Sequence, residues 1–141
     1  MVLSDKVLDI LNDMESIETV IYDSGFSANV RLDRKATPAA ILYLMTDWEL
    51  DISKGVLKES ADMEVFFCKR AEHDIKGEDK DIIVTETYEL AKEFLGLLLE
   101  DKTITVVDDS IKMRATYGKF DSFVVGCSLH IKIEERQGSC L

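Results

Sequence analysis

A long stretch of strict alternation near the C-terminal end constrains the fold of this chain more than any other feature. In residues 123–133, apolar side chains occupy every second position, and Val124, Gly126 and polar residues lie between them. Successive side chains of a strand point to opposite faces of a sheet, so the pattern predicts a strand of roughly 35 Å. The fold must therefore provide a cover for one face of a sheet.

Similar alternation predicts a hairpin near the N-terminal end. Residues 17–22 are rich in β-formers, Asp23-Ser24-Gly25 has turn chemistry, and residues 26–33 alternate again. Pro38 then precedes the run 39–45, which is apolar on both faces and predicts a central, covered strand that begins at the proline.

Four more strand regions follow from the same reasoning. Residues 48–59, with Gly55 among them, predict two strand ends joined by a turn or loop, and residues 60–70 predict a strand with Ala61, Met63, Val65 and Phe67 on one face. Residues 103–107 and 111–117 predict two further strands that precede the long one.

Two segments have helical spacing. Residues 5–15 predict a short helix with Ser4 as its N-cap, and residues 81–100 predict a long helix with a broad apolar stripe. A charged loop, residues 71–80, precedes the long helix. The order helix, strands, helix, strands predicts one α+β domain over residues 1–141, a mainly antiparallel sheet with both helices packed on one face.

Composition restricts the possible partners. The net charge is −11, from 17 basic and 28 acidic residues. This charge disfavours binding to nucleic acid or to an anionic membrane surface, and it suits either simple solubility or a surface that repels nucleic acid. No apolar run approaches the ~20 residues of a membrane span, and the first residues do not resemble a signal peptide, so we expect a protein that folds in a cytoplasm.

No motif for catalysis, a cofactor or a metal is recognisable in the sequence. Gly-rich phosphate loops and a GxSxG elbow are absent. The pairs Cys127 with His130 and Cys68 with His73 have poor geometry for a cysteine–histidine enzyme, and the odd cysteine count, which includes Cys140, argues against a disulfide framework. We therefore expect no catalytic, cofactor or metal residues.

Two clusters are nevertheless possible sites. The acidic segment Glu72-His73-Asp74 with Glu78, Asp79 and Asp81 could hold Ca²⁺ or Mg²⁺, but its spacing matches no EF-hand and favours a solvated loop. Asp62 and Glu64 lie on a strand face that also carries Phe66 and Cys68, which favours an interface over a pocket. With His130 they form the candidate set for a small-ligand or metal-dependent enzyme.

The layout resembles the tail terminator and tail-completion proteins of long-tailed bacteriophages. The resemblance is carried by residues 4–14, 17–33, the Pro38-Ala39-Ala40-Ile41-Leu42-Tyr43-Leu44 strand, and residues 63–69, 82–100 and 123–134. It is a pattern of elements over nearly the whole chain, without a diagnostic motif. The loop at 71–80 is short for this family, and the tail from Arg136 to Leu141 has no counterpart.

The resemblance implies a structural protein without an active site. Such proteins form a ring, commonly a hexamer, at the end of the tail tube, where they contact tube and head-connector proteins and let DNA pass through an acidic lumen. The implied location is the host bacterial cytoplasm during assembly and then the virion. The alternatives are an acidic binding module, such as a nucleic-acid mimic or immunity-like protein, and the enzyme described above.

Overall fold

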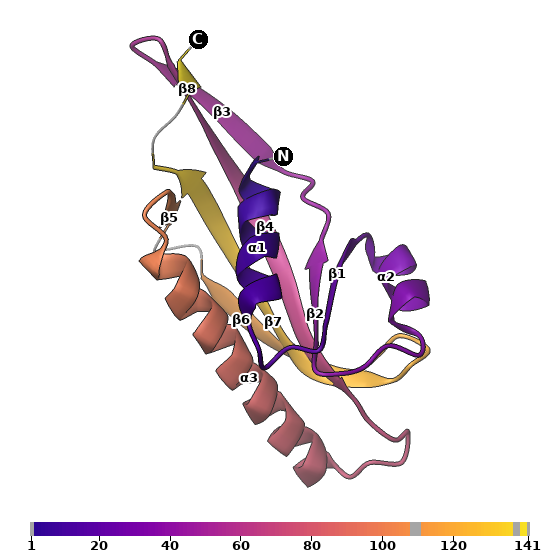
Figure 1. Cartoon of the computed structure of the whole chain (residues 1–141). Helices are drawn as coiled ribbons and strands as arrows, with labels where there is room; N and C mark the ends of the chain where they lie inside the picture. The colour runs from indigo at the N-terminus through magenta and orange to yellow at the C-terminus, as the bar shows by residue number, and fades with distance from the viewer. Residues whose placement is uncertain (1, 108–110, 137–138, 141) are drawn as a thin grey trace.

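The protein is an elongated α+β molecule in which one long sheet carries helices on both faces (Figure 1). The computed structural model describes residues 2–107, 111–136 and 139–140, without the side chains of Val2, Ser139 and Cys140. The elements in chain order are α1 (Val2–Asp13), β1 (Thr19–Asp23), α2 (Gly25–Leu32), β2 (Ala39–Tyr43), β3 (Trp48–Ser53), β4 (Val56–Arg70), α3 (Gly77–Glu100), β5 (Ile104–Val106), β6 (Lys112–Lys119), β7 (Val124–Glu135) and β8 (Ser139–Cys140).

Two long antiparallel strands, β4 and β7, form the centre of the sheet. They pair continuously from Ser60 opposite Glu134 to Arg70 opposite Val124. At Gly126 the strands approach so closely that a β-carbon would lie 2.0 Å from the carbonyl oxygen of Phe67. Only glycine fits such a contact without a backbone shift.

Shorter strands flank this pair on both sides. β2 and β3 lie along different halves of the same side of β4, and β5 and β6 likewise share one side of β7. β1 continues the sheet beyond β2, and the short β8 pairs with the start of β4. Every pairing except β1 with β2 is antiparallel, so the mainly antiparallel α+β prediction is confirmed for the described residues.

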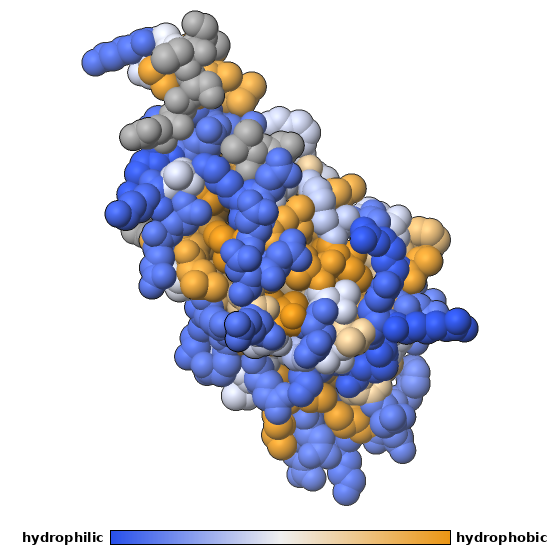
Figure 2. All heavy atoms as spheres, in the orientation of Figure 1, coloured by the Kyte–Doolittle hydropathy of each residue, from blue (hydrophilic) through white to orange (hydrophobic). Residues whose placement is uncertain are grey.

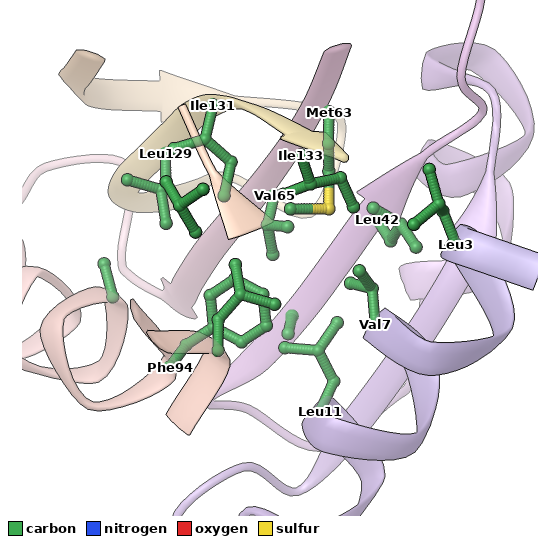
Figure 3. Packing of buried hydrophobic residues seen from close by; sticks show 14 of the residues in the cluster. Leu3, Val7, Leu11, Leu42, Met63, Val65, Phe94, Leu129, Ile131 and Ile133 are labelled. Atoms are coloured by element: carbon green, nitrogen blue, oxygen red, sulfur yellow. The ribbon is translucent and has the colours of Figure 1, made fainter. Parts of the chain in front are cut away.

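The main core lies between one face of the sheet and the helices α1 and α3. Leu3, Val7 and Leu11 line the inner side of α1, Met14 follows directly after it, and Ala91, Phe94 and Leu98 line the inner side of α3. They pack on alternate residues of β2, β4 and β7, such as Leu42, Val65 and Leu129 (Figure 3). We call this the helix face of the sheet. Each fully buried Leu, Ile or Phe side chain stabilises the fold by about 1.5–3 kcal/mol.

The predicted hairpin at residues 17–33 is wrong, because residues 25–32 form the helix α2. Ser24 caps this helix through its hydroxyl, which accepts a hydrogen bond from the amide of Ser27 at 3.4 Å. Ala28 and Leu32 are buried four residues apart, whereas Phe26 and Val30 point to solvent. β1 and β2 are consequently parallel, with α2 as the crossover between them.

The helix α2 packs against the opposite face of the sheet. Ala28 and Leu32 join Ile21, Ile41, Phe66, Cys68 and other residues in a second, smaller core cluster. The guanidinium of Arg70 donates to the carbonyl oxygens of Leu32 and Lys35, which ties the end of α2 to β4. The prediction of two helices on one face therefore holds for α1 and α3 and misses α2.

Other element predictions differ in their bounds. The first helix begins at Val2, so Ser4 lies inside it, buried, and the N-cap prediction at Ser4 is wrong. The long helix begins at Gly77, which shortens the predicted 71–80 loop. Pro38 lies directly before β2, whose residues Ala39, Ala40, Ile41 and Leu42 are fully buried, as expected for a central strand. No helix among the described residues has the length and apolar character of a membrane span.

Candidate functional site

The hairpin of β3 and the start of β4 extends beyond the helix layer at one end of the molecule (Figure 1). Its two-residue turn is Lys54-Gly55, with φ of 52° and 76°. Two successive left-handed residues are typical of the type I′ turn, whose twist matches that of the paired strands. We call this hairpin, residues 48–61, the arm.

The arm has large apolar side chains that the described chain leaves more than half exposed. Trp48, Leu50 and Ile52 alternate along β3 and are 54%, 56% and 66% exposed. Their register with Ala61, Glu59 and Leu57 places them on the helix face, but α1 and α3 end before they reach the tip. Hydrophobic side chains reach the surface in this upper region of Figure 2. Exposed apolar side chains on a strand with an unpaired edge are typical of an interaction surface.

The opposite face of the sheet is divided into two regions. α2 covers the part near β1 and β2, and the remainder is polar and open to solvent. We call this remainder the open face. It contains the alternate residues of the central strands: Ser60, which is itself buried, Asp62 and Glu64 from β4, and Ser128, His130, Lys132 and Glu134 from β7.

One cleft on the open face brings together two of the residues predicted as a possible enzyme site. Glu64 lies opposite His130, and its Oε1 atom is 3.8 Å from Nδ1 of the imidazole. Lys112, Met113, Arg114 and Ser128 complete a cleft of about 460 Å³. A carboxylate beside an imidazole can exchange a proton with a bound molecule, and the basic residues Lys112 and Arg114 line the same cleft.

Asp62, the third predicted residue, lines a separate cleft. This cleft of about 300 Å³ lies between the arm and the open face and includes Asp47, Glu49 and Lys132. Lys132 Nζ lies 3.5 Å from an oxygen of Glu49. The structure therefore pairs Glu64 with His130 but separates Asp62 from them.

The acidic segment at residues 72–81, which continues into the start of α3, contains no group of side chains arranged to hold an ion. Across residues 2–107, 111–136 and 139–140, no three His, Cys, Asp or Glu side chains gather in a group that could hold a metal ion. The His73 ring stacks on Phe123 at 4.5 Å, and Lys80 lies over the same ring. Asp81 lies instead beside Tyr117, where its negative charge raises the pKa of the phenol.

The cysteines have structural surroundings. Cys68 and Cys127 are buried and free, and burial raises the pKa of each thiol. Cys127 lies opposite Phe67, which belongs to the helix face, and His130 lies opposite Glu64, which belongs to the open face. The Cys127 and His130 side chains therefore point to different faces, as the sequence predicts. The Cys140 side chain lies outside the described residues.

One polar cluster has no signal in the sequence. The Lys119 ammonium lies 5.0, 5.4 and 5.2 Å from the ring centroids of Tyr43, Phe66 and Phe120. Its Nζ donates to the Tyr43 hydroxyl at 3.0 Å. Cation–π contacts of this kind contribute about 0.5–2 kcal/mol each, so the cluster fixes the end of β6 against β2. The residues come from distant parts of the chain, and only the tertiary fold brings them together.

Comparison with known proteins leaves the chain without an assigned family. No protein-family model matches it, and a search of curated proteins finds no relative.

Proposed function

We propose that this protein is a structural subunit of a phage or prophage tail, which forms a ring at the end of the tail tube through contacts between copies. The observation that carries the proposal is the arm, with Trp48, Leu50 and Ile52 exposed on β3, a strand whose outer edge has no partner among the described residues. An isolated chain leaves this surface in water, and a neighbouring copy removes it from water.

Charge and layout support the same role. A ring of subunits that each carry a net charge of −11 repels DNA from its lumen, which allows passage without adhesion. The resemblance to tail terminator proteins rests on α1, β2, β4, α3 and β7, since residues 17–33 form a strand and a helix where that layout has a hairpin. A hexamer is the assembly that this resemblance implies, with tube and head-connector proteins as partners in the virion.

The arm supplies a direct test. We expect Leu50→Ser with Ile52→Ser to raise the dissociation constant of the assembly by about 10- to 100-fold, because each half-exposed side chain loses roughly 1 kcal/mol of burial. Light scattering over a concentration series and negative-stain electron microscopy measure this effect. At concentrations where the wild type is monomeric, the melting temperature should change little, because both side chains are more than half exposed in the single chain.

A matched control removes equal apolar surface elsewhere. Phe26 and Val30 on α2 are 82% and 62% exposed, and Phe26→Ser with Val30→Ser should leave the assembly intact. A wild-type chain that stays monomeric at high concentration contradicts the proposal. The tail role has two tests of its own. The neighbouring genes should encode tail-tube and head proteins, and the ring should bind to the end of tubes assembled from the tail-tube protein.

A further inference from the structure

Two strands on opposite sides of the sheet, β3 and β6, have unpaired outer edges among the described residues. β3 pairs with β4 alone, and β6 pairs with β7 alone. All six residues of β3 are exposed, and no residue of β6 is buried. Unpaired backbone N–H and C=O groups on such edges can extend the sheet into another chain.

The two edges have matching patterns with opposite charge. In β3, the apolar residues alternate with Glu49 and Asp51. In β6, Met113 lies between Lys112 and Arg114. One edge is therefore acidic and apolar, and the other is basic and apolar, with the same period of two residues.

The register through the sheet shows that equivalent side chains lie on the same face. Glu49 lies opposite Ser60, an open-face residue. Lys112 lies opposite His130, which lies opposite Glu64, another open-face residue. The acids of β3 and the bases of β6 are therefore all on the open face.

The apolar residues of both edges lie on the helix face. Trp48 lies opposite Ala61, and Met113 lies opposite Leu129, and both partners belong to the main core. A sheet that continued from β3 into β6 would thus place carboxylates beside basic groups on one face and apolar side chains together on the other.

We propose that β3 of one copy pairs with β6 of the next copy, so that the sheet runs from subunit to subunit. β3, β4, β7 and β6 alternate in direction, which makes β3 and β6 antiparallel for copies that face the same way. Pairing of β3 with a second β3 would place acids beside acids, so charge selects a head-to-tail contact. Head-to-tail contacts generate rings when their rotation closes and filaments when it does not.

The edges also define how the copies are offset. Leu50 of β3 lies opposite Glu59 of β4. Arg114 of β6 lies opposite Ser128 of β7, which lies opposite Phe66 of β4, seven residues further along β4 than Glu59. β3 and β6 are therefore staggered by roughly 24 Å along the strands. A closed ring then requires strands that tilt relative to its axis, as in a β-barrel with a shear.

Reversal of charge tests this inference, which rests on the proposed function for its biological setting. Glu49→Lys with Asp51→Lys makes both edges of each copy basic, and Lys112→Glu with Arg114→Glu makes both edges acidic. We expect each variant to assemble at least about tenfold more weakly than the wild type, because like charges then meet at every contact.

An equimolar mixture of the two variants should restore assembly. The basic β3 edge of the first variant then meets the acidic β6 edge of the second, and the acidic β3 edge of the second meets the basic β6 edge of the first. The fourfold variant with both changes should also assemble alone. This rescue shows that each variant is folded, although Glu49→Lys removes the contact of Glu49 with Lys132. Asp9→Lys with Asp13→Lys, on the exposed side of α1, gives the same charge change away from both edges and should leave assembly unchanged.

The outcomes separate the inference from the proposed function. Rings that form equally well from all variants overturn the β3–β6 contact and leave the tail role intact. Charge-dependent assembly without binding to tail tubes supports the contact and contradicts the tail role. A monomeric wild type overturns both, and charge-dependent filaments support the edge contact while they contradict the ring.

Discussion

At the scale of single residues, Cys68 shows how the fold changes the chemistry of a side chain. Its thiol lies in the smaller core cluster beside α2, and burial raises its pKa from 9.0 to about 12. The nearby charges of Arg70 and Lys119 oppose this effect but do not outweigh it. At neutral pH the thiol is protonated, which makes it a weak nucleophile and a good core residue.

This raised pKa predicts a loss of stability in alkaline solution. In the unfolded chain the thiol ionises above pH 9, whereas the folded chain keeps it neutral until about pH 12. The unfolded state therefore binds fewer protons in this window, and the free energy of unfolding falls as the pH rises, by up to about 1.4 kcal/mol per pH unit.

The measurement is urea denaturation from neutral pH to pH 11 under reducing conditions. Cys68→Ala should reduce the slope above pH 9, although Tyr43 and Cys127, whose pKa values are also raised, retain part of it. A variant whose stability falls as steeply as that of the wild type would show that Cys68 is not the source.

The sequence could assign residues to faces but could not bring them together. Period-two alternation placed Asp62 and Glu64 on one face of a strand and His130 on one face of another, and this is confirmed. The 3.8 Å contact between Glu64 and His130 depends on the register of β4 against β7. That register follows from tertiary packing, and several registers with the same parity satisfy the alternation equally well.

At the scale of elements, α2 shows where pattern alone fails. Phe26, Ala28, Val30 and Leu32 are evenly spaced and predict one face of a strand. In a helix they form two pairs on different sides, Phe26 with Val30 and Ala28 with Leu32, and the members of each pair are four residues apart. Only Ala28 and Leu32 are buried. Eight residues are too few to distinguish the two periods, and the deciding feature is the cap that Ser24 provides before Gly25.

The cap makes a prediction about α2. Ser24→Ala should lower the free energy of unfolding by about 1 kcal/mol, because the amide of Ser27 loses its hydrogen-bond acceptor. Chemical denaturation followed by circular dichroism measures this change. Ser27→Ala is the matched control, since it keeps that amide and should change stability by less than half as much. Equal effects of the two substitutions would contradict the capping role of Ser24.

Longer elements were predictable because their patterns repeat over more residues. The strand expected at 60–70 corresponds to β4, and the one expected at 123–133 corresponds to β7. Both have one face against the main core, so apolar residues recur at every second position. The helix expected at 81–100 has its apolar stripe, with Ala91, Phe94 and Leu98 buried, and the helix extends further towards the N-terminus.

At the scale of the whole molecule, the sequence indicates the class of fold but not its topology. The succession of periods predicts α+β, and the covered face of each long strand predicts where helices pack. The sheet order β1-β2-β4-β7-β5 places β4 beside a strand more than fifty residues away in sequence. Local patterns contain no information about such partners, and the parallel β1–β2 pair depends on the helix that was missed.

The arm has a further use, because Trp48 is the chain's single tryptophan. Its indole is 54% exposed, so the emission spectrum of the dilute protein should have the red-shifted maximum of a solvated ring. If a neighbouring subunit covers the arm, the maximum should move to shorter wavelength as concentration rises, and Leu50→Ser with Ile52→Ser should suppress that move. A spectrum that stays constant while light scattering reports assembly would place the contact elsewhere. The protein thus contains a built-in optical probe at the surface where contact is expected.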